Sequence, residues 1–288
     1  MKKIFLVAVA VCLLAGVRTF AQNEPYTPPT AETETIAGVV KHTNLRYGPI
    51  PDTIPDSRSD RIFDLYLPAG AAAGKPVPVY LFVHGGGFSG GDKSLHPDMH
   101  RLIAGAGFAV MSINYRLRFS YHPKPGGGLS KEAGGASEFP SWYRRAVHDA
   151  AEDADMALAW IRDHGAEYNL DPKTVFAGGG SAGAITVLYL VYGAGRQALP
   201  VRGVVDFWGG LENTAVIRHG APPALIYHGD RDATIHFDYS VAIKHRMDEI
   251  GEKRTILHIL GGRGHAQYKY ITANRTDEII AFFRSLMR

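Results

Sequence analysis

Short and almost wholly apolar runs recur along this chain. Val77–Val83 (VPVYLFV) and Phe108–Asn114 (FAVMSIN) are the clearest of them. A strand is apolar along its whole length when both faces of its sheet are covered. Between such runs lie stretches with helical periodicity, of which Ala146–His164 is the best defined. Strands that alternate with helices predict a mostly parallel sheet with helices on both faces, which is the α/β class.

The other expected strands have the same apolar character. They are Arg61–Leu67, Val175–Ala177, Val204–Phe207, Ala224–Tyr227 and Thr255–Leu260. A final amphipathic helix is expected from about Thr276, because acidic residues in its first turn precede an apolar series. With 288 residues the chain is long enough to bury one large core.

The N-terminus is typical of a secretory signal peptide. Basic residues are followed by the apolar run Ile4–Ala15 and by small residues up to Ala21, after which cleavage is expected. The run is shorter than the roughly 20 residues of a spanning helix, so no stable membrane insertion is expected after cleavage. A retained N-terminal anchor is the alternative. The prediction is therefore a secreted or periplasmic protein with residues 1–21 as its signal peptide.

The composition after residue 21 separates a flexible segment from a folded domain, and it argues against nucleic acid binding and cysteine chemistry. Residues 22–35 are rich in Pro, Thr and Glu and predict a flexible segment, which leaves 36–288 as the folded domain. Loss of residues 1–21 lowers Lys+Arg from 31 to 28, equal to Asp+Glu at 28, so no basic field for nucleic acid remains. Cys12, the one cysteine, leaves with the leader, so disulfides, a thiol nucleophile and thiolate metal sites are excluded.

No metal site or cofactor is expected. His96 and His100 are four residues apart, but the glutamate of the zinc-protease pattern does not follow His96. We expect these two histidines to be a solvated surface pair. We also expect Asp153 and Arg116 to form a structural ion pair, because buried charges are normally paired.

One motif points to a nucleophile. Gly179–Gly183 (GGSAG) matches G-x-S-x-G, with the strand Val175–Ala177 before it and the helical stretch Ile185–Leu190 after it. Small neighbours permit the tight turn that exposes Ser181 above the sheet. Gly178–Gly183 also fits the dinucleotide fingerprint G-x-G-x-x-G, but that fingerprint normally opens the first βα unit of its domain. Here at least three strands come first, so we favour a serine nucleophile.

A glycine run follows the Val77–Val83 strand. In His84–Gly87 (HGGG) backbone N–H groups can point into a cavity without side chains in the way. The N–H groups of Gly86, Gly87 and Ala182 are the expected oxyanion hole for an acyl-transfer intermediate. We expect His84 to hold the turn in shape and not to transfer protons.

Three motifs in this order resemble the carboxylesterase and hormone-sensitive-lipase branches of the α/β-hydrolase superfamily. They are His84–Phe88 (HGGGF), Asn114–Leu117 (NYRL) and Gly180–Gly183 (GSAG). The resemblance extends from about Ile36 to the end of the chain. It implies the α/β-hydrolase fold and a serine carboxylic-ester hydrolase that forms an acyl-enzyme without a cofactor. The family's D-P-L-x-D motif is absent and Ala184 replaces a common glycine; both favour the branch of small secreted feruloyl and acetyl-xylan esterases.

The resemblance also suggests the acid and the base of a triad in the order Ser, Asp, His. In the family pattern H-G-x-x-D the last position is the acid, which is Asp232 here, with Asp230 as the alternative. The base must follow the acid, and His265 lies in a glycine-rich loop after the strand Thr255–Leu260. The other histidines after Asp232 lie too close to it, in a helical stretch, or inside a strand; they are His236, His245 and His258. The expected triad is Ser181, Asp232 and His265.

The segment Arg118–Trp142 is long and glycine-rich, and loops of that length are usually functional or disordered. It leaves the sheet at the carboxyl end of the strand Phe108–Asn114, where α/β sheets bind ligands. Its aromatic residues are therefore the expected substrate-binding residues: Phe119, Tyr121, Phe139 and Trp142. Packing of these rings onto the domain is the alternative.

The favoured substrates are short-chain or aromatic esters, acetyl or feruloyl, on plant polysaccharide. A serine exopeptidase of the prolyl-oligopeptidase kind usually adds a propeller or cap domain, for which the chain has no room. A lipase usually has an apolar lid, whereas Arg118–Trp142 is polar and glycine-rich. A non-catalytic binding protein on this scaffold would be expected to lack a triad residue, and none is missing.

Overall fold

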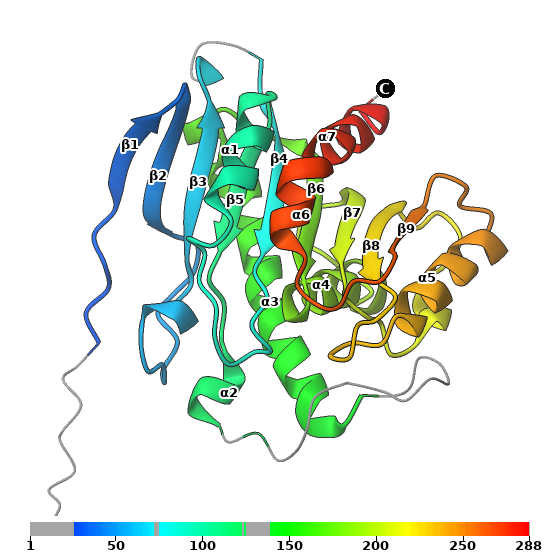
Figure 1. The fold of residues 1–288 in the computed structure, drawn as a ribbon. Coiled ribbons are helices and arrows are strands. Elements are labelled where there is room, and N and C mark those ends of the chain that lie inside the picture. Colours follow the sequence, from blue (N-terminus) through cyan, green and yellow to red (C-terminus); the bar gives the residue numbers. More distant parts are fainter. Residues whose placement is uncertain (1–25, 72–74, 123, 125–138, 288) are drawn as a thin grey trace, which may run out of the picture.

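The computed structural model describes residues 26–71, 75–122, 124 and 139–287 (Figure 1). The expected signal peptide, residues 1–21, lies outside the described residues, as does most of the glycine-rich part of Arg118–Trp142. The described chain forms one nine-stranded sheet in the order β1-β2-β3-β5-β4-β6-β7-β8-β9. The strands are β1 (Glu32–Ile36), β2 (Val39–Arg46), β3 (Ile62–Pro68), β4 (Val77–Val83), β5 (Ala109–Ile113), β6 (Leu170–Gly180), β7 (Val201–Phe207), β8 (Ala224–Gly229) and β9 (Ile256–Leu260).

The sheet is antiparallel at one edge and parallel across the rest. The pairs β1–β2, β2–β3 and β3–β5 are antiparallel, and all pairs from β5–β4 to β8–β9 are parallel. The α-helices are α1 (Pro97–Gly105), α2 (Arg118–Tyr121), α3 (Ser141–His164), α4 (Ala182–Leu188), α5 (Asp238–Glu249), α6 (Tyr268–Asn274) and α7 (Thr276–Ser285). The short helical turns are Ser57–Ser59, Gly165–Tyr168, Tyr189–Gly193 and Thr214–Val216. The prediction of a mostly parallel α/β sheet is confirmed.

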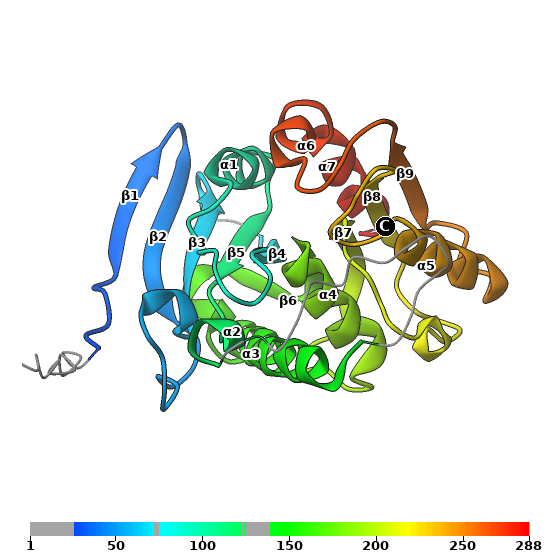
Figure 2. The same cartoon turned by 60° about the horizontal axis from the view of Figure 1, so that its bottom comes forward.

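Helices cover both faces of the sheet, and Figure 2 shows the two layers. On one face α1, α6 and α7 pack through Ile103, Ile271 and Phe283. On the other face α3, α4 and α5 bury an apolar stripe each, for example Leu158 of α3. The central strands are therefore buried on both sides, as their apolar sequences predict.

The N-terminal edge corrects the expected domain boundary. Glu32–Ile36 pairs with β2, so the sheet begins four residues before Ile36, inside the segment 22–35 that was expected to be flexible. All five residues of β1 are exposed. The strand is held by backbone hydrogen bonds and buries no apolar face, so it has no apolar pattern for sequence analysis to detect.

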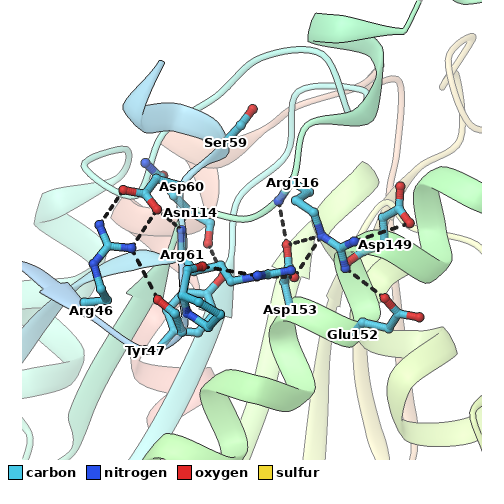
Figure 3. Close-up of polar contacts among 12 residues, drawn as sticks. Arg46, Tyr47, Ser59, Asp60, Arg61, Asn114, Arg116, Asp149, Glu152 and Asp153 are labelled. Atoms are coloured by element: carbon cyan, nitrogen blue, oxygen red, sulfur yellow. Dashed lines mark hydrogen bonds and ion pairs between the residues drawn. The ribbon is translucent and has the colours of Figure 1, made fainter. Parts of the chain in front are cut away.

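The expected ion pair between Arg116 and Asp153 is present, within a larger network (Figure 3). Asp153 is fully buried on α3 and accepts from Arg116 Nε at 3.0 Å and from Arg61 Nε at 2.9 Å. Arg116 also binds Glu152, at 2.9 Å. Arg61 directly precedes β3 and Arg116 follows β5, so the network fastens two neighbouring strands to α3.

Candidate active site

Ser181 occupies the sharp turn between β6 and α4. Its backbone has φ 56° and ψ −122°, a strained conformation for a residue with a side chain. The turn lies so close to the end of β4 that a Cβ on Gly183 would be 2.0 Å from the Val83 carbonyl oxygen. Glycine is therefore required there, which gives the G-x-S-x-G pattern its physical reason.

The structure brings the three expected triad residues together. His265 Nε2 lies 2.9 Å from Ser181 Oγ, and His265 Nδ1 lies 2.6 Å from Asp232 Oδ2. Because a carboxylate only accepts, Nδ1 carries the proton and donates it to Asp232. The unprotonated Nε2 then accepts from the serine hydroxyl, the arrangement that a general base needs.

Asp232 is held as a carboxylate. It is buried, and its Oδ1 accepts the backbone N–H groups of Thr234 at 2.8 Å and Ile235 at 3.0 Å. Burial by itself would raise the pKa of Asp232. Hydrogen bonds from His228 and His265 outweigh it and hold the pKa of this carboxyl well below its usual range. The ionised form at neutral pH suits the role of orienting His265.

Asp230, the alternative acid, has a different contact. It is exposed and accepts the N–H of Gly262 at 2.7 Å, which ties the turn after β8 to the loop that carries His265. The structure therefore places Asp232, and not Asp230, against the histidine.

His228 contributes to the site and was missed by sequence reasoning. It is fully buried, with Nε2 at 2.9 Å from the Ile235 carbonyl oxygen and 3.3 Å from Asp232 Oδ2, and Nδ1 at 2.7 Å from Ser240 Oγ. Since a carbonyl only accepts, Nε2 carries the proton and faces the carboxylate as well. The signal was present in the H-G-x-x-D pattern, which was used only to locate its aspartate.

The glycine run after β4 borders the same site. Gly86 and Gly87 have φ of +123° and +62°, and the Gly86 carbonyl closes a turn by accepting the N–H groups of Ser89 and Gly90 at 3.1 Å. Ala182 is the first residue of α4, so its N–H has no partner within that helix. These are the three expected oxyanion-hole positions, and the two glycines line the pocket that contains Ser181.

His84 contacts the glycine turn through a hydrogen bond. It is fully buried, and its Nδ1 lies 2.7 Å from the Gly85 carbonyl oxygen. Burial lowers the pKa of His84 to about 4, so the ring is neutral at physiological pH and donates to that carbonyl. This geometry fits the expected role of holding the turn.

The pocket at Ser181 has a volume of about 390 Å³. Its walls come from the loop after β4, the residues before α1, the end of β7, and the loops after β8 and β9. They are Gly85, Gly86, Gly87, Gly91, Leu95, His96, Ser181, Trp208, Thr234, His265, Ala266 and Tyr268. The pocket thus contains Ser181, His265 and the glycine turn, and its other walls are mostly apolar.

The four aromatic residues expected to bind substrate do not line this pocket within the described chain. Phe119 packs against Trp142 with ring centroids 5.5 Å apart, and Phe139 packs against Tyr143 at 5.4 Å. Tyr121 lines a separate groove, next to Arg118. The expectation is corrected: Phe139 is buried in the core on the α3 face, and Phe119 and Trp142 are partly buried against that core.

The expectation of a solvated His96–His100 pair is wrong. His100 is fully buried against the rings of Tyr66 and Phe82, and burial lowers its pKa to about 3. His96 stacks on Tyr268 with ring centroids 3.5 Å apart and lines the pocket. The helix α1 places His100 on its buried face, and this helix was not predicted from the sequence.

Within the described ranges, no three or more His, Cys, Asp or Glu residues form a group that could hold a metal ion. The described helices also include none with the length and apolar character needed to cross a membrane.

Comparison with known proteins agrees with this architecture. The BD-FAE family model matches residues 63–123, the region that contains the glycine turn. The secreted triacylglycerol lipase LIP1 of Gibberella zeae is 29% identical over 161 residues, which are 54% of this chain and 25% of that protein. The carboxylic ester hydrolase LipN of Mycobacterium tuberculosis is 33% identical over 120 residues, 41% of this chain and 25% of that protein. The alignments thus span about a quarter of the length of these curated relatives.

Solved structures match most of the chain. A truncated carbohydrate esterase from gut microbiota aligns with a TM-score of 0.63 and 18% identity, over 85% of this chain and 95% of that chain. Esterase 2 of Thermogutta terrifontis, phosphorylated by paraoxon, aligns with a TM-score of 0.62 and 22% identity, over 91% and 97%. The chain therefore has the α/β-hydrolase fold, and in sequence and architecture it is similar to esterases and lipases.

Proposed function

We propose that this protein is a serine carboxylic-ester hydrolase that works through an acyl-enzyme. The proposal rests chiefly on the unbroken hydrogen-bonded chain from Ser181 Oγ through His265 to Asp232. The nucleophile, the base and the orienting acid are each within hydrogen-bond reach of the next, as acyl transfer requires.

The reaction follows from this geometry. Ser181 Oγ attacks the ester carbonyl carbon while its proton passes to His265 Nε2, and Asp232 stabilises the imidazolium. The oxyanion accepts hydrogen bonds from the N–H groups of Gly86, Gly87 and Ala182. The bond to the alcohol oxygen then breaks, with His265 returning the proton to it. Water, deprotonated by His265, attacks the acyl-enzyme and releases the acid and free Ser181.

For the substrate we propose short-chain or single-ring acyl groups, of the acetyl or feruloyl type. A pocket of about 390 Å³ lies at the small end of ligand sites, and Leu95, Trp208 and Tyr268 give it apolar walls. The names of matched relatives favour a second candidate, a lipase that accepts long acyl chains. We also propose secretion, on the basis of the leader-like residues 1–21.

An ester panel tests the proposal. We expect 4-nitrophenyl acetate and 4-nitrophenyl butyrate to be hydrolysed with kcat/KM on the order of ten-fold or more above 4-nitrophenyl decanoate, because a chain longer than the pocket cannot be fully accommodated. Methyl ferulate should exceed methyl decanoate in the same way, since these two esters share one alcohol. Activity should persist after exhaustive chelation, since the proposed steps use only side chains and backbone N–H groups. Preference for the decanoate would favour the lipase, and cleavage of an aminoacyl anilide alone would favour a peptidase.

A further inference from the structure

A second contact, besides the triad hydrogen bond, joins the segment that carries His265 to the turn that carries Ser181. Tyr268 lies three residues after His265 and is the first residue of α6, and the tip of its ring lies against Gly180. A Cβ on Gly180 would stand 1.9 Å from the Tyr268 hydroxyl oxygen and 2.6 Å from its Cζ. Gly180 directly precedes Ser181, so the lack of a side chain there is what admits the ring beside the nucleophile.

The backbone of Gly180 does not itself require glycine. Its φ lies outside the left-handed region, unlike that of Gly86 and Gly87, so its conformation alone does not exclude a side chain. The atoms nearest to the Cβ position are the tip of the Tyr268 ring and then Trp208 Nε1, at 3.3 Å. The ring of Tyr268 therefore explains why glycine stands at this position of the GGSAG motif.

The contact between Tyr268 and Gly180 is steric and is not a hydrogen bond. The Tyr268 hydroxyl is buried and has no hydrogen-bond partner among the described residues, and the same holds for Trp208 Nε1. A buried polar group without a partner costs free energy. Because the hydroxyl is enclosed, it is not open to a ligand in the Ser181 pocket either. What the hydroxyl and Cζ contribute is their volume against Gly180.

The ring of Tyr268 is also held on its other sides. His96 stacks on it with ring centroids 3.5 Å apart and an interplanar angle of 20°, and the ring of Trp208 meets it nearly at right angles, at 4.8 Å. Ala266, between His265 and Tyr268, has φ 61°, a strained conformation that persists only where the surroundings fix it. Because closely packed rings have little free space to move into, the nucleophile turn cannot shift without displacing Tyr268.

We infer that Tyr268 is a positioning residue that sets the distance between Ser181 Oγ and His265 Nε2, which is 2.9 Å. The inference rests on the proposed esterase function, in which the proton crosses that distance. Tyr268 acts on the serine through Gly180 and on the histidine through the short link between them. A displacement of about 1 Å between reacting groups lowers a rate by up to about 100-fold, so a change of volume at this contact should be visible in kcat.

Substitutions on the two sides of the contact test the inference, with kcat and KM measured on 4-nitrophenyl acetate and 4-nitrophenyl butyrate. Tyr268→Leu removes the tip of the ring, and Tyr268→Phe keeps the ring without its hydroxyl. Gly180→Ala adds a methyl group that collides with the ring, and the double variant Gly180→Ala/Tyr268→Leu adds it where the ring tip is gone. Gly261→Ala is the matched control, since Gly261 lies in the loop that carries His265 and has nothing within 4 Å of its Cβ position.

We expect Tyr268→Leu to lower kcat about ten-fold on both esters with KM within about two-fold of the wild type, and Tyr268→Phe to keep kcat within about three-fold. Gly180→Ala should lower kcat on the order of 100-fold. The double variant should exceed Gly180→Ala by about ten-fold, because the collision is relieved and substitutions in contact are not additive. Gly261→Ala should retain the wild-type kcat.

An unchanged kcat in Tyr268→Leu would overturn the inference, as would a loss confined to one ester, which is the sign of a pocket wall only. A double variant that shows the product of the two single losses would also overturn it. So would a loss in Tyr268→Phe as large as that in Tyr268→Leu, because the hydroxyl would then act by hydrogen bonding. Melting temperatures show which variants fold, and Tyr268→Leu decides the question if Gly180→Ala does not. A wild type that hydrolyses neither ester would refute the proposed function, and this inference with it.

Discussion

At the residue scale, the site depends on how each charge is held. Asp232 receives two backbone N–H groups and the His265 ring N–H, whereas the exposed Asp230 receives one backbone N–H from the loop beyond. Two carboxylates two residues apart thus have different tasks. One faces the His265 imidazole, which moves the proton in the proposed mechanism, and the other is hydrogen-bonded to the loop that carries His265.

This difference predicts unequal effects of the same substitution. Asp232→Asn should lower kcat by about 10³–10⁴-fold, since the amide cannot hold the imidazole in the required tautomer. Asp230→Asn should lower kcat by no more than about five-fold, because its Oδ1 can still accept from Gly262. Steady-state kinetics on 4-nitrophenyl acetate checks both. If Asp230→Asn proved the more damaging change, the assignment of the acid would be wrong.

We expect His228 to act through Asp232, as a positioning residue, because its Nε2 lies 3.3 Å from Asp232 Oδ2. His228→Leu removes the Nε2–H that faces the carboxylate, and we expect kcat to fall roughly ten-fold with little change in KM, as for the loss of one hydrogen bond to a charged group. His228→Gln offers an N–H in its place and should recover part of the loss. A rise in KM with unchanged kcat, or no recovery in His228→Gln, would contradict this role.

At the element scale, the strands with apolar runs were predicted well. The bounds of β4 are those expected, and β5, β7, β8 and β9 each fall within a few residues of their predictions. The short helices α1 and α6 were not predicted, because each spans only two or three turns.

The candidate active site was predictable where the local sequence or the order of residues along the chain restricts the choice. Local sequence marks Ser181, since the turn after β6 tolerates only small neighbours, and chain order limits the choice of acid and base. The sequence did not indicate where the side chains of Phe119, Phe139 and Trp142 would pack. An aromatic ring in a loop satisfies the same pattern whether it lines a pocket or packs on a helix, and only the position of α3 decides.

The strand β7 contains a buried carboxyl group, Asp206, whose effect on the free energy of unfolding should be measurable. Asp206 is fully buried; its Oδ1 accepts the Gly209 N–H at 2.7 Å, and its Oδ2 has no partner among the described residues. Burial raises the pKa of Asp206 from 3.8 to about 6, despite opposing contributions from His228 and Gly209. At a pH between these two pKa values, Asp206 is ionised in the unfolded chain and protonated in the native state. The free energy of unfolding therefore falls as pH rises from about 4 to about 6.

Asp206→Asn should remove this pH dependence. The amide retains an acceptor for Gly209 and carries no charge. The free energy of unfolding of the variant, relative to that of the wild type, should therefore rise by up to about 3 kcal/mol as the pH is raised from about 4 to about 8. Urea unfolding at the two pH values measures the difference. Asp52→Asn, which removes an exposed carboxylate, is the control. Equal pH dependence in wild type and Asp206→Asn would show that Asp206 is not the group responsible.

At the scale of the whole molecule, the two faces of the sheet have different tasks. The α3 face holds the buried ion-pair network and the larger of the two apolar core clusters, so it supports the fold. The face covered by α1 and α6 borders the Ser181 pocket through His96 and Tyr268. The turn after β6 places Ser181 in the pocket on this side, and the proposed hydrolysis takes place there.

Covalent labelling of the nucleophile tests the central claim most directly. Paraoxon transfers a phosphoryl group to an activated serine, and we expect one group per chain, on the peptide that contains Ser181, with ester hydrolysis lost in proportion to labelling. Ser181→Ala should take up no label, show the wild-type melting temperature, and have kcat lowered by about 10⁴-fold or more. Retention of wild-type hydrolysis by Ser181→Ala, or by a chain fully labelled at Ser181, would contradict the account.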